Sequence, residues 1–341
     1  MTEKERLLAA LRLEEMDRPP CASPLQTGIV DLMRSCDAYW PQANDDPHLM
    51  ARLAKSAHVV AGLESVRVPF DVTVDATAFG ATTGKESLDR QPAVLGCAFT
   101  TRDRLEEAIV PDPEVAGRAP VVLEALRMLA DDPALEGTPI ICGVVGPFML
   151  AGQLRGTESA LMDLVLDPDS LHLAVEKASR WGMAFSRAAL EAGADVIAII
   201  DATSSGDILS PGQFEEFALP YQRKVAASIR EAGGRSVLHI CGRTDGNMPH
   251  MIDVGADGIS VDQAMDIGWV KRQVRGRAAC IGNVSPTSTL LFGSPQDVRA
   301  ETRRVMEAGT DVVAPGCGLA PLTPLANVRA MVEQSLGHGL R

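Results

Sequence analysis

Glu191-Ala-Gly-Ala-Asp-Val196 decides the fold, because similar hexapeptides recur at 253–258 (Asp-Val-Gly-Ala-Asp-Gly) and 307–312 (Glu-Ala-Gly-Thr-Asp-Val), with a looser copy at 231–237. In each copy a glycine ends a helical pattern, and glycine favours the left-handed backbone at a helix C-terminus. A polar residue and a short apolar run follow, which is typical of a strand buried on both faces. The repeated unit is therefore a helix, a glycine and a parallel strand.

Eight candidate strands emerge when this pattern is followed outward along the chain. They lie at Pro20–Pro24, Ser65–Phe70, Ile140–Val145, Asp195–Asp201, Ser236–Cys241, Gly258–Asp262, Ala278–Asn283 and Asp311–Pro315. Helical patterns lie between and after them, at Pro211–Ala232, Gly246–Val254, Pro295–Ala308 and Pro324–Leu336. Eight strands alternating with helices favour one (β/α)8 TIM barrel, an α/β fold, over a doubly wound sheet. We therefore predict a single domain over residues 1–341, in which residues 1–18 form a short N-terminal helical extension on the outside of the barrel.

The composition indicates a globular protein with a sizeable core. The chain has 341 residues, of which 46% are hydrophobic and 23% are charged, far from the composition of disordered chains. Its net charge of -13 comes with no cluster of Lys and Arg, so nucleic acid and anionic membranes are not expected as partners. Glycines and a proline interrupt the longest uncharged stretch, Gly137–Leu154, which indicates a buried strand and its loop rather than a membrane span.

The cysteines and the N-terminal residues bear on the compartment. An odd number of irregularly spaced cysteines in a chain of this length argues for reduced thiols rather than a disulfide framework. The first residues carry mixed charges in an amphipathic helical pattern, where a secretory signal would need an apolar core. We therefore expect a cytoplasmic protein.

Chemically reactive side chains gather at predicted strand ends, where a barrel of this class builds its active site. His239 and Cys241 end the strand at 236–241, and the two-residue period of a strand places both on the same side. Cys317 follows the last strand and lies between two glycines. One histidine and two cysteines on one rim form a zinc site of the open kind, which leaves a fourth position for water or substrate. Spacing alone leaves open the alternative that these side chains are buried without a metal.

The other five cysteines share no strand end with a second ligand. They are Cys21, Cys36, Cys97, Cys142 and Cys280. A lone cysteine at a strand end is usually a small buried apolar side chain, so we predict that none of the five is functional.

Four stretches of the chain carry a family resemblance. They are His239-Ile-Cys-Gly242, Gly258-Ile-Ser-Val-Asp262, Ile281-Gly-Asn-Val-Ser-Pro286 and Ala314-Pro-Gly-Cys-Gly-Leu-Ala-Pro321. They resemble the methylcobamide:coenzyme M methyltransferases, a branch of the uroporphyrinogen decarboxylase-like superfamily. Residues 2–20, 68–71, 201–211 and 214–221 are also similar, so the resemblance covers nearly the whole chain. In that branch a His-x-Cys pair and a distant Cys hold zinc, and the matching residues here are His239, Cys241 and Cys317.

One departure separates the chain from uroporphyrinogen decarboxylases proper. Those enzymes carry an Arg-rich first loop that grips the carboxylates of their substrate. The corresponding loop here, Ser23–Ile29, has no cation. We therefore do not expect decarboxylation of uroporphyrinogen, since a shared fold does not imply a shared reaction.

The resemblance implies a zinc-dependent methyl transfer to a thiol. Zn²⁺ held by two thiolates would lower the pKa of a substrate thiol from about 8.5 towards or below neutrality and keep its sulfur nucleophilic. The thiolate would attack the methyl group of a methyl-Co(III) corrinoid, releasing a Co(I) corrinoid and a methyl thioether. Coenzyme M is the favoured acceptor. The alternative acceptors are homocysteine, another small thiol, or tetrahydrofolate, which has no thiol. A further alternative is a metal-binding barrel that catalyses no reaction.

Polar residues at other strand ends are candidates for the same site. Asp201 and Asp262 end the strands at 195–201 and 258–262, and each could be a fourth zinc ligand, orient His239 or bind the acceptor. The alternative is a carboxylate that caps the next loop or helix. Asn283 is a further catalytic candidate. Asp71 is a candidate for cofactor binding.

The methyl donor is expected to be a separate molecule. Corrinoid-carrying domains usually show an Asp-x-His-x-x-Gly signature, and the chain has none. We therefore expect a separate corrinoid-binding protein, or free methylcobalamin, as the methyl-donor substrate. The sulfonate of coenzyme M would need a cationic or amide-rich pocket, for which Arg67, Arg155 and Arg243 are candidates.

Overall fold

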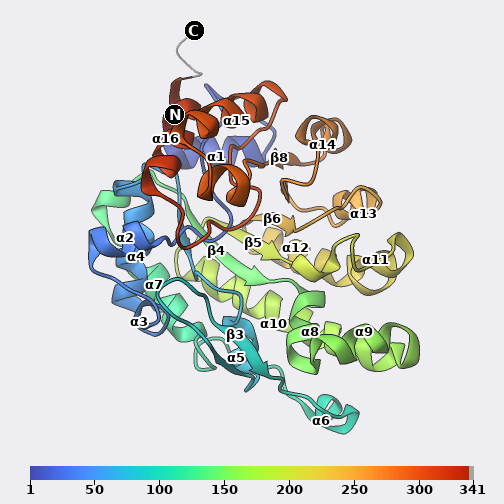
Figure 1. Ribbon diagram of the computed structural model, residues 1–341. Helices are drawn as coiled ribbons and strands as arrows, with labels where there is room; N and C mark the ends of the chain where they lie inside the picture. Colours follow the sequence, from blue (N-terminus) through green and yellow to red (C-terminus); the bar gives the residue numbers. More distant parts are fainter. Residues whose placement is uncertain (338–341) are drawn as a thin grey trace.

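The computed structural model describes residues 1–337, and its centre is a parallel sheet surrounded by helices (Figure 1). Six strands lie in the order β1-β4-β5-β6-β7-β8, and every neighbouring pair is parallel. Their bounds are β1 Val66–Val68, β4 Ile140–Val145, β5 Val196–Ile200, β6 Arg235–Ile240, β7 Gly258–Val261 and β8 Ala279–Ile281. Nearly all of their residues are buried, so six of the eight predicted strands are confirmed, together with their burial on both faces.

Two short segments close this sheet into a barrel. Residues 312–315 form parallel bridges to Ile281 and Val284 on one side and to Cys21 on the other. The carbonyl of Cys21 in turn accepts a hydrogen bond of 2.8 Å from the amide of Glu64, just before β1. The predicted (β/α)8 barrel is therefore confirmed, although its strands at 20–24 and 311–315 are shorter than regular strands.

Helices cover the outside of the barrel (Figure 1). They are α2 Val30–Cys36, α3 Gln42–Asp45, α4 Pro47–Val59, α5 Val74–Ala78, α6 Arg102–Glu107, α7 Ala119–Ala130, α8 Pro147–Arg155, α9 Thr157–Leu166, α10 Pro168–Glu191, α11 Pro211–Phe217, α12 Leu219–Glu231, α13 Met248–Asp253, α14 Ile267–Val274, α15 Pro295–Glu307 and α16 Leu325–Gly337, with the 3-10 helices η1 Pro133–Leu135 and η2 Ala202–Ser204 and the π-helix η3 Pro286–Leu291. The predicted helices at 246–254, 295–308 and 324–336 are confirmed as α13, α15 and α16. The predicted helix at 211–232 is instead two helices that meet at Ala218, because Pro220 has no N–H to continue the helical ladder.

The N-terminal extension forms one helix, α1 (Glu3–Leu11), and its position differs from the prediction. Leu7 and Leu11 are buried in the same apolar cluster as Ile141, which lines the inside of the barrel. A Cβ atom on Gly258 at the start of β7 would lie 2.9 Å from a methyl group of Leu11. The helix therefore covers the amino-terminal end of the barrel instead of its outer side. The reason is physical, since an apolar helix face packs against the largest apolar surface within reach.

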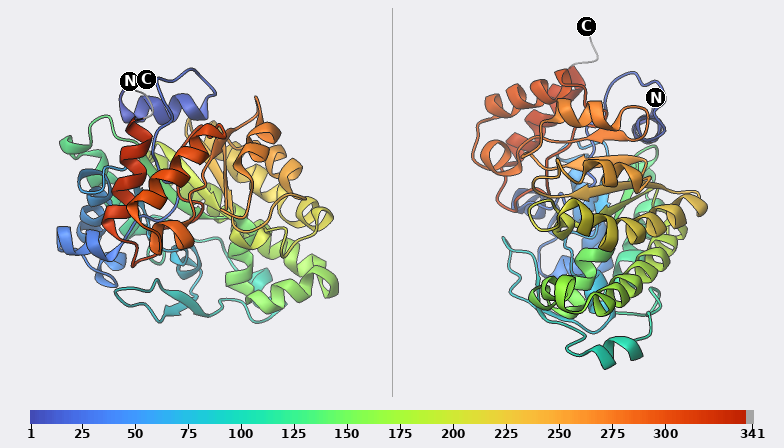
Figure 2. Two further views of the ribbon diagram at one scale, coloured as in Figure 1. Left: turned by 45° about the horizontal axis from the view of Figure 1, so that its top comes forward. Right: turned by 90° about the vertical axis from the view of Figure 1, so that its right-hand side faces the viewer.

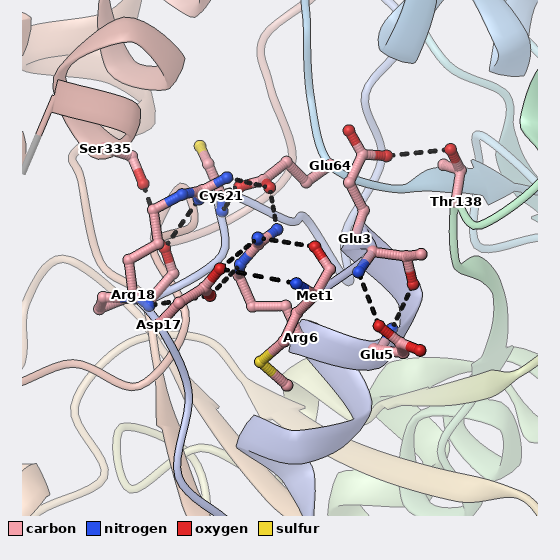
Figure 3. Close-up of polar contacts among 12 residues, drawn as sticks. Met1, Glu3, Glu5, Arg6, Asp17, Arg18, Cys21, Glu64, Thr138 and Ser335 are labelled. Carbon is pink, nitrogen blue, oxygen red and sulfur yellow. Dashed lines mark hydrogen bonds and ion pairs between the residues drawn. The ribbon is translucent and has the colours of Figure 1, made fainter. Parts of the chain in front are cut away.

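An ion-pair network fastens α1 to the barrel (Figure 3). Glu64 is 2% exposed and accepts hydrogen bonds from Arg6 of α1 (2.8 Å) and from Arg18 (2.6 and 2.7 Å). Arg6 also donates to both oxygens of Asp17, at 2.7 and 2.8 Å. The amide of Cys21 completes the set with a hydrogen bond of 2.8 Å to Glu64. Every charged group in this network therefore has a partner of opposite charge.

An antiparallel hairpin of β2 (Thr82–Gly84) and β3 (Ala93–Gly96) follows β1 and was not among the predicted strands. In the left view of Figure 2 the teal hairpin lies at the opposite end of the molecule from the dark blue α1. Because α1 covers the amino ends of the strands, the hairpin lies on the side of their carboxyl ends.

Within residues 1–337, no helix combines the length and the apolar composition that crossing a membrane requires. The single domain over 1–341 stays a prediction, and its residues 338–341 lie outside the described part of the chain.

Candidate metal centre

His239, Cys241 and Cys317 come together at the carboxyl end of the barrel. Nε2 of His239 lies 3.2 Å from Sγ of Cys241, which lies 3.6 Å from Sγ of Cys317. The three ligand atoms all lie within 4.8 Å of one another, and no other group of His, Cys, Asp or Glu in residues 1–337 has this spacing. His239 is fully buried, and both cysteines are half-buried. The structure thus brings the three predicted metal ligands to one point.

Glycines beside the two cysteines let the backbone reach this point. A Cβ atom on Gly316 would lie 2.6 Å from the amide nitrogen of Gln263, so only glycine allows the segment before Cys317 to approach so closely. Gly242 directly follows Cys241 and has a φ of 70°, in the left-handed region that glycine favours.

Ser260 on β7 orients the imidazole of His239. The two residues are in register between β6 and β7, so their side chains lie on the same face. Nδ1 of His239 lies 3.0 Å from Oγ of Ser260. This contact leaves Nε2 facing the sulfur atoms, which is how metal-binding histidines are usually held. Sequence reasoning missed Ser260, because the register between neighbouring strands cannot be read from either strand alone.

The two thiols share a hydrogen bond and titrate as a pair. The hydrogen bond with Cys241, opposed by burial and assisted by His239, lowers the pKa of Cys317 to about 4. The same hydrogen bond, together with burial, raises the pKa of Cys241 far above its ordinary value. One thiol therefore ionises readily, and a dication at this point would favour both as thiolates.

This donor set fits Zn²⁺. In a tetrahedral zinc site with two sulfur ligands and one nitrogen ligand, neighbouring ligand atoms lie about 3.6–3.8 Å apart. The distances of 3.2 and 3.6 Å here are close to that range. An imidazole nitrogen and two thiolates are softer donors than magnesium or calcium prefer. Three protein ligands also leave one position open for a substrate.

A cavity of about 210 Å³ opens beside the three ligands. Apolar side chains form most of its wall, among them Phe70, Met149 and Ile200, and no described acidic side chain lines it. Gln26 belongs to the loop at 23–29, so the loop without cations contributes directly to this wall. This loop therefore contributes none of the arginines that would clamp a polycarboxylate substrate.

Asp201 caps a helix and does not join the three ligands. Its carboxylate accepts hydrogen bonds from the amides of Phe148 (3.2 Å) and Met149 (2.7 Å) at the start of α8, and from Gln222 (2.8 Å). Burial raises the pKa of Asp201 to about 6, although these hydrogen bonds oppose the shift. These contacts are a capping role, as in the alternative considered for this residue, but the capped helix α8 precedes Asp201 in the chain rather than following it.

Asp262 and Asn283 hold the loop that follows β7. The carboxylate of Asp262 accepts a hydrogen bond of 2.9 Å from the amide of Ala264. Asn283 donates to the carbonyls of Asp262 (2.9 Å) and Met265 (2.8 Å). Asp262 is close enough to the ligands for its charge to contribute to the raised pKa of Cys241. Catalytic roles for Asp262 and Asn283, as for Asp201, stay predictions.

Asp71 is engaged by Arg118, a partner that sequence reasoning missed because it lies 47 residues away in the chain. The guanidinium donates to both oxygens of Asp71, at 2.8 and 2.9 Å, and Thr73 donates as well. Burial alone would raise the pKa of Asp71, but Arg118 and Thr73 hold it below its ordinary value. A cofactor-binding role for Asp71 stays a prediction.

The five other cysteines lie outside the metal group found among the described residues. Burial raises the pKa of Cys142 and Cys280 to about 12 and that of Cys21 further still. Thiols of this kind are poor ligands and poor nucleophiles.

Comparisons with known proteins bear on the chain as a whole. The uroporphyrinogen decarboxylase (URO-D) family profile matches residues 2–335. Methylcobamide:CoM methyltransferase MtbA of Methanosarcina acetivorans is 37% identical over 332 residues, which cover 97% of each chain. Methylcobamide:CoM methyltransferase MtaA of Methanosarcina barkeri is 38% identical over 333 residues, covering 97% of this chain and 96% of its own. The solved structure of a methyltransferase from Methanosarcina mazei covers 99% of both chains at 39% identity, with a TM-score of 0.94.

These matches confirm the family that the sequence resemblance indicated. They span the barrel, its N-terminal helix and the strand ends that carry His239, Cys241 and Cys317. The chain therefore belongs to the uroporphyrinogen decarboxylase family and, within it, is a methyltransferase of the methylcobamide:CoM methyltransferase branch.

Proposed function

We propose that this methyltransferase moves a methyl group from a methyl-Co(III) corrinoid to the sulfur of a small thiol, with coenzyme M as the favoured acceptor. The observation that carries the proposal is the His239–Cys241–Cys317 group in the wall of an apolar cavity. Relatives with 37% and 38% identity over nearly the whole chain are named methylcobamide:CoM methyltransferases, which supports both substrates. We infer zinc as the metal, because the three donor atoms have the chemistry and spacing of an open zinc site.

The residues of the site hold and shelter the reacting sulfur. When bound, Zn²⁺ would stabilise the acceptor sulfur as a thiolate at neutral pH. His239, Cys241 and Cys317 would hold the metal, and Ser260 fixes the imidazole through Nδ1. Phe70 in the cavity wall contributes to keeping water from the sulfur, which preserves its nucleophilicity.

The reaction balances without an additional oxidant or reductant. A sulfur lone pair forms the new C–S bond while the Co–C bond breaks, and both electrons of that bond stay on the cobalt, which leaves as Co(I). The thiol proton passes to solvent. Because the chain lacks the Asp-x-His-x-x-Gly signature, the donor would arrive on a separate corrinoid protein or as free methylcobalamin. We place the reaction in the cytoplasm, where the thiols of the site stay reduced.

The direct test gives the purified, zinc-loaded protein methylcobalamin and a thiol under anaerobic conditions. Formation of Co(I) is followed by absorbance, and the methyl thioether is identified by mass spectrometry. Coenzyme M and homocysteine are compared as thiol acceptors, with tetrahydrofolate as an acceptor that has no thiol, and we expect coenzyme M to react fastest. Protein with a full complement of zinc that demethylates methylcobalamin with neither thiol, or with tetrahydrofolate alone, would refute the proposal.

A further inference from the structure

Arg67 is a buried cation in the wall of the cavity. It lies in the middle of β1, in register with Ile141 of β4, whose side chain belongs to the apolar cluster inside the barrel. Residues in register share a face of the sheet, so Arg67 also points inward. It is 1% exposed and lines the same cavity as Cys241 and Cys317.

The guanidinium of Arg67 has few partners. Among the residues that the structure describes, its one hydrogen bond goes to the carbonyl of Pro69, and its buried Nε has none. A guanidinium carries five N–H donors, and a buried charge without a partner is costly. Such departures from complete pairing are expected at functional sites, where a ligand supplies the missing acceptors.

The nearby carboxylates do not neutralise this cation. In residues 1–337 none forms an ion pair with Arg67, and Asp71 is already paired with Arg118 at 2.8 Å. Asp75 accepts a hydrogen bond of 2.9 Å from Trp181, and burial raises the pKa of Asp75 to about 7, so it carries only part of a negative charge at neutral pH. Burial lowers the pKa of Arg67 itself to about 10, which leaves it positively charged under the same conditions.

The neighbouring strand makes room for the guanidinium. Gly143 of β4 lies two residues after Ile141 and therefore faces inward as well. A Cβ atom on Gly143 would collide with Nη2 of Arg67. The absence of a side chain at 143 thus lets the cation stay where it is.

We propose that the guanidinium of Arg67 binds the anionic group of the methyl acceptor, whose sulfur lies at the His239–Cys241–Cys317 group. This inference rests on the proposed methyl transfer to a thiol and adds the residue that selects the acceptor. The substrate class is a small thiol that carries a sulfonate or carboxylate a short alkyl chain away from the sulfur. A planar guanidinium offers two parallel N–H groups to either anion, and the apolar wall suits the alkyl chain between.

The same arrangement disfavours homocysteine and neutral thiols as acceptors, and the other two candidate arginines do not fit the role. The ammonium group of homocysteine would find no acidic side chain in the described wall of the cavity and would lie near a cation. A neutral thiol would leave Arg67 without its partner. Arg155 is paired with Asp163 at 2.9 Å, Arg243 is exposed, and neither lines the cavity.

The first experiment measures anion binding without methyl transfer. The probe is ethanesulfonate, which has the anion but no thiol, titrated into the zinc-loaded protein by calorimetry. We expect Arg67→Met to weaken its binding by about 10- to 100-fold, the size of a lost hydrogen-bonded charge pair. Arg155→Met is the matched control and should change the affinity by less than about twofold, since it lies outside the cavity. Wild-type protein that does not bind ethanesulfonate, or an unchanged affinity in Arg67→Met, would overturn the assignment.

The second experiment compares coenzyme M, 3-mercaptopropionate and 2-mercaptoethanol as acceptors from methylcobalamin. Wild-type protein should favour the two anionic thiols by about 10- to 100-fold in kcat/KM. Arg67→Met should lose this preference, mainly through KM, because the anion is bound equally before and during the reaction. If this variant does not retain zinc, Arg67→Lys replaces it; it keeps the charge without the planar fork and should show an intermediate preference. An equal loss for all three thiols would show that Arg67 does not recognise the anion.

The two proposals fail in different ways. If ethanesulfonate binding depends on Arg67 but no thiol is methylated, methyl transfer is wrong and the anion site stands. If thiols are methylated without regard to their charge, methyl transfer stands and the role of Arg67 is wrong.

Discussion

The two ends of the barrel bury charge in opposite ways. At the amino end, Glu64 is 2% exposed and meets Arg6 and Arg18 at 2.8 and 2.6 Å, and Arg6 also reaches Asp17 (Figure 3). At the carboxyl end, Arg67 is 1% exposed and donates to one neutral carbonyl. The ion pairs around Glu64 fasten α1 to the barrel, whereas the unused N–H donors of Arg67 can bind a ligand. Burial alone therefore does not distinguish the two arginines; Arg67 differs from Arg6 in being buried without a carboxylate partner among the described residues.

The largest expected effect lies at the amino end. Glu64→Gln leaves two arginines facing a neutral group, and breaking a buried ion pair from one side costs about 3 kcal/mol or more. We expect the free energy of unfolding to fall by that amount in urea denaturation, with kcat per folded molecule retained. The matched control is Glu114→Gln, whose pair with Arg127 is exposed and should contribute less than about 1 kcal/mol. Equal losses of unfolding free energy in the two variants would contradict the expected difference between a buried and an exposed ion pair.

The pH dependence of Glu64 sharpens the same comparison. Burial alone would raise the pKa of Glu64, but Arg18, the amide of Cys21 and the charge of Arg6 hold it below its ordinary value. A carboxyl with a lowered pKa contributes stability above its unfolded pKa of about 4.3, and that contribution is lost as the pH falls through the folded value. The difference in unfolding free energy between wild type and Glu64→Gln should therefore be constant above about pH 5 and shrink below it. A difference that grows on acidification would contradict this assignment.

The second-largest effect is expected at the metal centre, at the carboxyl end of the barrel. Cys317→Ala removes one of three metal ligands, and we expect methyl transfer to fall by more than about 100-fold with loss of zinc. Metal analysis and the cobalt absorbance assay measure the two losses separately. Cys97→Ser is the control, because Cys97 is half-buried and lies outside the metal group. Full zinc and full activity in Cys317→Ala would place the site elsewhere.

A smaller effect is expected from the residue that orients a ligand. Ser260→Ala removes the partner of His239 Nδ1, and we expect zinc affinity to fall by about 10- to 100-fold in competition with a chelator. The unfolding free energy of the metal-free protein should change by less than about 1.5 kcal/mol, which separates orientation from folding. Ser236→Ala, at the amino end of β6, should leave the zinc affinity unchanged. A loss of stability without a loss of zinc affinity would make Ser260 a purely structural residue.

Local sequence patterns were sufficient to predict the strands of the barrel, but not the β2–β3 hairpin or the position of α1. The apolar run at Ile140–Val145 has the same bounds in the sequence pattern and in the structure, because its burial on both faces is written into consecutive residues. The spacing of Leu7 and Leu11 predicts an apolar helix face. It does not say that this face meets the barrel interior, because that depends on residues far away in the chain.

The candidate site likewise contains residues that the sequence could predict and residues that it could not. His239 and Cys241 could be paired from the two-residue period of one strand, and Cys317 from its glycines and the family resemblance. The contact of Ser260 with His239 and the pairing of Asp71 with Arg118 could not be predicted from the sequence. Each depends on the register or packing of distant segments. Arg67 was one candidate among three, and only its burial and its missing partners single it out.

The smallest expected effect is the sharpest test of the comparison. Arg6→Met at the amino end removes charge-assisted hydrogen bonds to Glu64 and Asp17 but leaves Glu64 with Arg18, and should lower the free energy of unfolding by about 2 kcal/mol. Arg67→Met instead replaces an unpaired buried cation with an apolar side chain, which removes a desolvation cost and loses one hydrogen bond to Pro69. We therefore expect the unfolding free energy of metal-free Arg67→Met to rise or to stay within about 1 kcal/mol of wild type. Urea denaturation of both variants, with m-values that match wild type, measures the difference. If Arg67→Met lost as much stability as Arg6→Met, Arg67 would be a structural cation like those around Glu64, and its free donors would not be reserved for a substrate.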